Sequence, residues 1–520
     1  MRRLPAVLLI LLAVRFYATR SGAGIGVGTF AGAQDEAHYS NAALRMARHG
    51  EWLTPYFMDR FYLYKPPLVY WLSAASVKLT GVSADALRRP AKLASATVLL
   101  FVFLLAGNGW AGLAAAAALT LSPLFGDLGA RNMTDALLCL WIVLAAWLIS
   151  QDRRFERAST WVGLGVVTGL AILTKSTAGL IPLLLAGALW LVDRDLRSLA
   201  RIAGSAAVAS AVAAPWFVYQ SLVHPRWFWA EFVEIELLAY GAGTPPQYIQ
   251  GSAPAFYRDA LLAGALLPLA ASLVSLLEAA LGRSWTLLRR EQPLGPAGAA
   301  VLAWLVVMVA AIASFQYRNN TYLLPVIPAL AILAGQGRLS RAGVFVAFPL
   351  IAFSGSPPET DRLDATRSAL QQYCEMRRPN ELVIAGAVDS FHAAVLPLAR
   401  LRYAFPGEGQ PPKGFALDFR SMGIVMPVSE FLELERHRPR YAAVMRDWGL
   451  PNDAPLATVV AFPTEKDLTR LVESSPDRDF LLPQPFPSRS HRHWTASSGR
   501  TLLLGRDAPP RPSLPWACRM

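Results

Sequence analysis

Long apolar segments separated by short polar connections dominate the chain up to residue 354. A membrane-spanning helix needs about 20 apolar residues, and the segments that approach this length predict about eleven spans. The predicted spans are 4–18, 90–108, 110–125, 135–150, 162–174, 178–192, 199–219, 255–277, 297–315, 322–335 and 342–353. This pattern is typical of a polytopic α-helical membrane protein.

Beyond residue 354 the chain becomes rich in proline and charged residues. Two short apolar runs, 381–385 and 441–445, have the length and composition of buried strands. They predict a small α/β domain over residues 355–520, following a transmembrane domain over residues 1–354. The aromatic and Arg-rich segment 491–494 is interpreted as a solvated tail rather than a contact for a glycan or a lipid headgroup.

Arginines mark one side of the predicted spans. They occur in alternate connections, and only the tight turn 107–109 breaks the alternation. The positions are Arg2, Arg3, Arg153, Arg154, Arg157, Arg194, Arg197, Arg201, Arg283, Arg289, Arg290, Arg338 and Arg341. Because cytoplasmic connections are the ones enriched in Lys and Arg, we expect a cytoplasmic N-terminus. The first large loop and the C-terminal domain are then predicted to lie outside.

The first outside loop, residues 20–89, contains two amphipathic stretches that are too polar to span a bilayer. These stretches, 37–49 and 67–79, are predicted to form helices at the membrane surface, with Tyr64 and Trp71 at headgroup depth. A second outside loop, residues 220–254, carries aromatic residues with acidic neighbours. It predicts a further interfacial helix.

Composition agrees with this interpretation. Hydrophobic residues make up 54% of the chain and charged residues 16%, whereas soluble domains carry about 25% charged residues. The net charge of +13 does not require a nucleic-acid partner, because arginines beside the spans account for it. The basic, apolar start resembles a signal peptide. Since Arg15 interrupts the apolar run and no small-residue cleavage site follows, we expect a retained first helix.

The cysteines and histidines indicate little chemistry. Cys139 lies in a predicted span and is expected to be packed there. Cys374 and Cys518 fall in the C-terminal domain, where an outside location would allow them to pair. His38 and His49 have no partners at metal-ligand spacing, so no metal site is expected.

Ionisable and tyrosine side chains collect at the outside ends of the predicted spans. Ionisable groups within a membrane are costly and usually face an interior cavity. Carboxylates at two span ends can supply a general base, and lysine and arginine suit a phosphate. The set therefore fits a phosphate-activated lipid donor. Its members are Asp35, Glu36, Tyr39, Lys65, Asp127, Asp135, Lys175, Arg318 and Tyr322.

Each of these residue types also has a purely structural interpretation. Acids such as Asp35 and Asp135 are favoured at helix starts, where they interact with the helix N-terminus. Lys65 precedes two prolines and suits a solvated turn. Lys175 lies at a span boundary, where lysines commonly extend toward the headgroups. Single residues do not decide between structure and chemistry, whereas their order along the chain does.

The order of the motifs resembles glycosyltransferase family 39. Its first loop is similar to Gln34-Asp-Glu-Ala-His-Tyr39, Gly50-Glu-Trp52 and Tyr64-Lys-Pro-Pro-Leu-Val-Tyr-Trp71. Asn132-Met-Thr-Asp135, Leu173-Thr-Lys-Ser176 and Asn320-Thr-Tyr-Leu-Leu-Pro-Val-Ile-Pro-Ala329 then follow in the family's order. The resemblance covers residues 34–335. The family includes protein O-mannosyltransferases and the bacterial enzymes that place aminoarabinose on lipid A.

This resemblance implies a GT-C fold in the inner membrane of a bacterium, with the active site in the periplasm. The small C-terminal α/β domain, predicted above to lie outside, is then periplasmic too. It implies inverting transfer of a sugar from a polyprenyl-phosphate donor to a lipid, glycan or protein acceptor. Asp35 would be the principal catalytic carboxylate and Asp135 the second. The donor phosphate would be held by Lys65, Lys175, Arg318 and Tyr322. Further site candidates are Glu36, Tyr39, Tyr64, Asp127 and Glu234.

No cofactor is expected, since a lipid monophosphate does not need the metal bridge that a nucleotide diphosphate commonly takes. The chain departs from the family in its later outside loop, where relatives often carry Glu-His followed by Arg. Here Glu234-Ile-Glu236 is followed by Tyr240, about where that arginine is expected. Ser176 also replaces the usual glycine after Lys175.

The missing arginine leaves open a catalytically impaired binding or assembly protein with the same fold. A transporter is the alternative from another class, and it would place polar residues near the bilayer midplane and show symmetry between halves. The predicted spans are mostly Ala, Leu and Val, with the ionisable residues at one face. This distribution favours the transferase.

Overall fold

The computed structural model describes residues 4–19, 35–57, 60–239, 252–286, 296–315 and 318–353, together with parts of the region 369–506. The chain divides into two compact units. The first comprises Met1–Gly22, Gly28–Ala33 and Leu63–Ser356, and the second Ala23–Val27, Gln34–Tyr62 and Pro357–Met520. This division assigns residues 34–62 to the second unit, whereas the sequence predicted one domain over residues 1–354. The boundary of that predicted domain stays a prediction.

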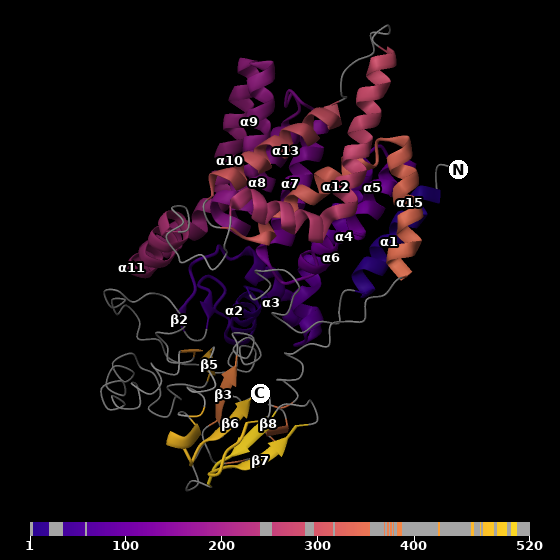
Figure 1. The fold of residues 1–520 in the computed structure, drawn as a ribbon. Helices are drawn as coiled ribbons and strands as arrows, with labels where there is room; N and C mark the ends of the chain where they lie inside the picture. Colours follow the sequence, from indigo (N-terminus) through magenta and orange to yellow (C-terminus); the bar gives the residue numbers. More distant parts are fainter. Residues whose placement is uncertain are drawn as a thin grey trace. The chain divides into compact units, whose positions relative to one another are not determined.

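The described part of the first unit is helical (Figure 1). Every predicted span overlaps at least one of its helices, while the count of about eleven spans stays a prediction. The helices are α1 (Leu4–Thr19), α3 (Leu68–Thr80), α4 (Ala84–Leu105), α5 (Trp110–Thr120), α6 (Pro123–Leu128), α7 (Thr134–Gln151), α8 (Ala158–Lys175), η1 (Ser176–Leu180), α9 (Ile181–Asp193), α10 (Leu196–Val223), α11 (Pro225–Phe228), η2 (Trp229–Ala239), α12 (Ala253–Thr286), α13 (Pro296–Ser314), η3 (Asn320–Val326), α14 (Ile327–Ala334) and α15 (Arg338–Phe353).

Several of these helices suit a bilayer. Among the described residues, 5 helical segments are long and apolar enough to cross one, or 6 if the bent pair Asn320–Ala334 and Arg338–Ile351 counts as a span. Leu4–Ala18 and Trp110–Thr120 are apolar but shorter. Large apolar side chains such as Leu191 and Val306 remain exposed along the helices. Such an apolar surface suits lipid rather than water.

The core of the first unit lies around α7 and α14. All eight residues of α14 are buried, and the helix packs against α12 and α5. The α8 helix packs along α10, and glycines allow the two helices to approach closely. A Cβ atom added at Gly165 would lie only 2.6 Å from the carbonyl oxygen of Ser205, so a larger residue would push the helices apart. A Cβ at Gly169 would meet the Val212 side chain at 2.5 Å. Small residues at such contacts are how helices associate within membranes.

The α12 helix is kinked at Ala265, whose backbone is non-helical. Pro268 is the cause, because proline has no N–H to donate to the carbonyl of Gly264 four residues earlier. The Ser122 hydroxyl donates to that carbonyl instead, at 2.6 Å. The kink therefore leaves the Gly264 carbonyl satisfied, as burial in an apolar medium requires.

The amphipathic stretches predicted in the outside loops are helical. The stretch 67–79 corresponds to α3, and 37–49 corresponds to α2 (Asp35–His49) in the second unit. The later loop contains α11 and the π-helical segment η2. Their location at a membrane surface stays a prediction.

The second unit contains two sheets. A short hairpin pairs β1 (Tyr56–Phe57) with β2 (Arg60–Phe61). The larger sheet has the order β4-β5-β3-β6-β8-β7, parallel from β4 to β6 and antiparallel from β6 to β7. Its strands are β3 (Leu382–Gly386), β4 (Val425–Met426), β5 (Val459–Ala461), β6 (Asp479–Leu482), β7 (Arg492–Thr495) and β8 (Thr501–Leu504).

The outcome of the sequence interpretation is mixed in this unit. The predicted strand 381–385 corresponds to β3, while 441–445 lies outside the described residues. The interpretation of 491–494 as a tail is wrong, because residues 492–494 belong to β7, which pairs with β8, and His491 is buried. The side chains of Arg492 and His493 are exposed, as expected for a solvated segment. Cys139 is buried, as expected, whereas Cys374 and Cys518 lie outside the described residues.

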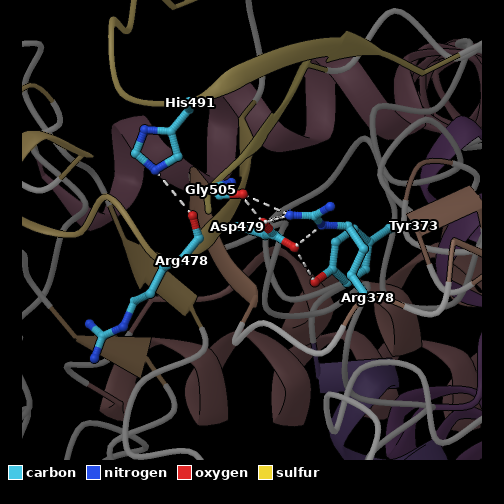
Figure 2. A network of polar contacts seen from close by, with 6 residues as sticks. All are labelled: Tyr373, Arg378, Arg478, Asp479, His491 and Gly505. Carbon is cyan, nitrogen blue, oxygen red and sulfur yellow. Dashed lines mark hydrogen bonds and ion pairs between the residues drawn. The ribbon is translucent and has the colours of Figure 1, made fainter. Parts of the chain in front are cut away.

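A network of buried polar groups holds β6 in place (Figure 2). Asp479 accepts hydrogen bonds from the Tyr373 hydroxyl at 2.8 Å, from Arg378 Nε at 2.7 Å and from the Gly505 amide at 2.8 Å. Nε2 of His491 faces the backbone carbonyls of Ser475 and Arg478, and burial lowers the pKa of His491. A buried carboxylate with this many donors stabilises one arrangement of the strands, so the network is structural.

Candidate active site

Three of the predicted site residues meet where separate elements begin or end. Asp135 lies in the first turn of α7, and its Oδ1 is 2.6 Å from the Nζ of Lys175 at the end of α8. The same Nζ lies 5.1 Å from the centre of the Tyr322 ring in η3. Both charged side chains are largely buried, with exposed fractions of 4% for Asp135 and 13% for Lys175. We call this group the Asp135–Lys175–Tyr322 cluster.

The start of α7 is fixed by a hydrogen bond from a neighbouring helix. The Ser73 hydroxyl of α3 donates to Asn132 Oδ1 at 2.7 Å, and it also contacts the carbonyl of Leu87 in α4 at 3.1 Å. Asn132 and Asp135 belong to the motif that opens this span. The motif therefore has a structural part, held by Ser73, and a charged part that contacts Lys175.

The chain reverses sharply after Lys175. A Cβ at Gly179 in η1 would lie 2.2 Å from the backbone nitrogen of Ile172, so only glycine allows η1 to return this close to α8. Ser176 has φ +42° and ψ −118°, a conformation that glycine adopts easily and other residues do not. This geometry gives a physical reason for the glycine that the family usually has after the lysine.

Replacing Ser176 with Gly is expected to stabilise the protein by about 1 kcal/mol, because it relieves the backbone strain at a positive φ. The measurement is the thermal unfolding temperature of the purified protein in detergent. Ser176→Ala is the matched control, since alanine removes the hydroxyl but keeps the strain. A glycine variant that unfolds no later than the alanine variant would contradict the expectation.

Lys65 lies in a second ion pair of the same unit. Its Nζ pairs with the Glu236 carboxylate of η2, and both side chains are mostly buried. One turn earlier in η2, the fully buried Glu231 accepts a hydrogen bond from the backbone amide of Leu63. Two carboxylates thus hold η2 against the segment that carries Lys65. Sequence reasoning did not propose either contact.

The other candidates of the first unit have separate partners. Asp127 in α6 pairs with Arg131, whose Nε lies 2.9 Å from Oδ1. Glu234 is exposed and accepts a hydrogen bond from the Trp229 indole at 2.9 Å. Arg318 precedes η3, and Tyr64 precedes Lys65, each partly buried. Tyr240 lies outside the described residues.

The remaining candidates lie on α2 of the second unit. Asp35 occupies the first position of the helix and is partly exposed. Glu36 is fully buried, and the buried Tyr39 ring lies 6.4 Å from the Tyr62 ring. The structure therefore brings Asp135, Lys175 and Tyr322 together, while the role of each predicted site residue stays a prediction.

Comparison with known proteins shows what the chain is similar to in sequence and in fold. A family model described as dolichyl-phosphate-mannose-protein mannosyltransferase matches residues 64–219. An undecaprenyl phosphate-alpha-4-amino-4-deoxy-L-arabinose arabinosyl transferase of Erwinia tasmaniensis is 30% identical over 321 residues, covering 59% of this chain and 56% of that protein. The corresponding protein of Pseudomonas aeruginosa PAO1 is 28% identical over 320 residues, covering 59% and 55%. The chain thus spans about half the length of these curated relatives.

Solved structures are similar over nearly the whole chain. The structure of ArnT from Cupriavidus metallidurans covers 97% of this chain and 99% of its own, at 16% identity. The TM-score is 0.61 for its apo state and 0.62 for the state bound to undecaprenyl phosphate. With the apolar helices described above, this likeness defines an integral membrane protein with the GT-C fold.

These matches support the resemblance of the chain to glycosyltransferase family 39. The fold class and the family resemblance predicted from the sequence are therefore confirmed.

Proposed function

We propose that the protein transfers a sugar from a polyprenyl-phosphate donor to a lipid acceptor at the periplasmic face of a bacterial inner membrane. The observation that carries this proposal is the Asp135–Lys175–Tyr322 cluster, in which a buried lysine lies between a carboxylate and a tyrosine. A cation in such a place can neutralise a phosphate leaving group. The resemblance to glycosyltransferase family 39 supports a polyprenyl phosphate as the donor, and the names of the arabinosyl transferases above support 4-amino-4-deoxy-L-arabinose as its sugar.

The proposed reaction needs one base and a neutralised phosphate. Asp35 accepts the proton of the acceptor hydroxyl while its oxygen attacks the anomeric carbon of the sugar. The bond between that carbon and the phosphate oxygen breaks, which inverts the anomeric centre and releases the polyprenyl phosphate. Lys65, Lys175 and Arg318 stabilise the negative charge of the leaving phosphate, with Tyr322 as a hydrogen-bond donor. Asp135 holds Lys175 in place by the 2.6 Å ion pair.

A second candidate function is donor binding without transfer. The observation in its favour is the sequence Glu234-Ile-Glu236 in the later loop, where relatives often carry an arginine nearby. In the structure Glu236 is paired with Lys65, so this loop brings a negative charge to a proposed phosphate ligand. Both candidates require the donor to bind, and they differ in the product.

Lipids and glycoproteins from cells with and without the protein provide the test, with lipid A as the expected acceptor. We expect mass spectrometry to find an aminopentose on lipid A only in cells that produce the protein. A sugar on glycoproteins instead would replace the acceptor in the proposal. Unchanged lipid and glycoprotein profiles, together with binding of undecaprenyl phosphate by the purified protein, would favour the second candidate.

A further inference from the structure

Two buried acceptor atoms of the first unit have no hydrogen-bond partner. One is Oδ1 of Asn320, the first residue of η3, and the other is Oδ2 of Asp127 in α6. Neither atom has a donor within hydrogen-bond distance among the residues that the structure describes. A buried acceptor without a partner is costly, and such a group in a native protein calls for an explanation in its function.

Local structure explains the neighbours of these acceptors but not the acceptors themselves. Asn319 caps η3, because its Oδ1 accepts a hydrogen bond from the Thr321 amide at 3.0 Å. Asn320 makes no such bond from its Oδ1. In α6, Nε and Nη2 of Arg131 both lie against Oδ1 of Asp127, at 2.9 and 2.5 Å. The ion pair therefore uses one oxygen of the carboxylate and leaves the other available.

Both acceptors lie on elements that adjoin the proposed donor site. The α6 helix packs against η3. Two residues after Asn320, the Tyr322 ring lies 5.1 Å from Nζ of Lys175. Two residues before Asn320 is Arg318, another proposed phosphate ligand. Asn320 is thus placed between two proposed phosphate ligands along one short segment.

The chemistry of the two acceptors selects a ligand that donates hydrogen bonds. A phosphate oxygen is itself an acceptor, and the Asp127 carboxylate would repel it. A sugar supplies hydroxyl donors, and 4-amino-4-deoxy-L-arabinose also supplies an amino group, which is protonated at neutral pH. A hydrogen bond between an ammonium and a carboxylate is about twice as strong as one between neutral groups. The carboxamide of Asn320 both accepts and donates, which suits a sugar hydroxyl.

We propose that Asp127 and Asn320 bind the sugar of the polyprenyl-phosphate donor. Oδ2 of Asp127 accepts a hydrogen bond from the ammonium of the sugar, and Oδ1 of Asn320 accepts one from a hydroxyl. This inference rests on the proposed function and names residues that select its sugar. The proposed phosphate ligands all donate hydrogen bonds whereas these two residues accept them, so the two sets recognise different parts of the donor.

Comparing two ligands isolates the contribution of the sugar. Dissociation constants are measured with the whole chain in detergent, without acceptor, for undecaprenyl phosphate and for undecaprenyl phosphate that carries 4-amino-4-deoxy-L-arabinose. We expect the unaltered protein to bind the second ligand more tightly. In Asn320→Leu and in Asp127→Asn, the affinity for the second ligand is expected to fall about five- to tenfold with the loss of one hydrogen bond, while the affinity for undecaprenyl phosphate stays the same.

A third ligand separates the two residues. With a hydroxyl in place of the amino group of the sugar, we expect Asp127→Asn to have a smaller effect, because the ligand no longer carries the positive charge that the carboxylate binds. The effect of Asn320→Leu is expected to stay the same. An equal effect of Asp127→Asn on both sugars would overturn its assignment to the ammonium.

Asn319→Leu is the matched control, because it removes the neighbouring carboxamide, which caps η3. We expect this variant to unfold at a lower temperature and to keep the ratio of the two dissociation constants. Asn320→Leu is expected to unfold at the same temperature as the unaltered protein or a higher one, since no protein group loses a partner.

The outcomes separate this inference from the proposed function. An unchanged ratio of the two dissociation constants in either variant overturns the role of that residue, as does an equal loss of affinity for both ligands. Equal binding of the two ligands by the unaltered protein overturns the inference for both residues. Failure of the unaltered protein to bind undecaprenyl phosphate overturns the proposed function as well.

Discussion

Replacing Asp35 with Asn is expected to reduce sugar transfer by about 10²- to 10⁴-fold, the usual contribution of a general base. Asparagine has nearly the same shape as aspartate but cannot take the proton of the acceptor hydroxyl. The measurement is the rate of transfer from a polyprenyl-phosphate sugar to lipid A in membranes that contain equal amounts of each protein. Binding of undecaprenyl phosphate is expected to change little, because Asp35 is not among the proposed phosphate ligands.

The structural interpretation of Asp35 makes a different prediction. Asp35 occupies the first turn of α2, where a carboxylate interacts favourably with the helix N-terminus. If that were its only role, the asparagine variant would lose about 0.3–1 kcal/mol of stability and would retain full transfer. Asp193→Asn is the control, because it removes a carboxylate that pairs with Arg153 in connections predicted to be cytoplasmic. Retained transfer in Asp35→Asn would end its assignment as the base.

The hydrophobic pattern was sufficient to place the helices of the first unit. Apolar runs near the length of a span leave few alternatives to a helix, because backbone groups in an apolar medium must be satisfied within the segment. The kink in α12 was not predicted, since it depends on how Ser122 from another helix satisfies the carbonyl freed by Pro268. The hydrophobic pattern gives the periodicity of a single helix, and it does not show which residue of another helix satisfies a freed carbonyl.

Pairing between distant residues was the main part of the site that the sequence could not supply. Asp135 and Lys175 were both candidates, but their ion pair joins residues 40 positions apart. Lys65 and Glu236 are 171 positions apart, and Glu236 was noted only as part of a departure from the family.

The strand β7 is an element that the sequence pattern did not predict. Segment 491–494 is polar and basic, which is typical of a tail. In the structure Trp494 pairs in register with Leu502 of β8, whose residues are all buried. An edge strand with solvated side chains is defined by its neighbour, and charged residues are common at such edges. Its own sequence therefore gave no strand signal.

The Asp135–Lys175 pair is expected to produce the largest combined effect on stability and transfer. Replacing Lys175 with Met leaves the buried Asp135 carboxylate without its cation, which is expected to cost about 3–5 kcal/mol. Asp135→Asn leaves a buried ammonium and is expected to cost a similar amount. In the double variant both charges are absent, so we expect much of the stability to return. Thermal unfolding in detergent, measured for all four proteins, gives the coupling between the two residues.

Transfer is expected to behave differently from stability across these variants. Because Lys175 is proposed to neutralise the leaving phosphate, the double variant should fold well and still lose transfer, by about 10²-fold or more. The pair Arg153–Asp193 is the matched control: its side chains are 31% and 29% exposed, and its closest contact is 2.7 Å. Exposed pairs contribute about 0–1 kcal/mol, so its removal should change neither property appreciably. A stable double variant that transfers sugar at the normal rate would make the Asp135–Lys175 pair a purely structural contact, and the phosphate charge would have to be neutralised by Lys65 and Arg318.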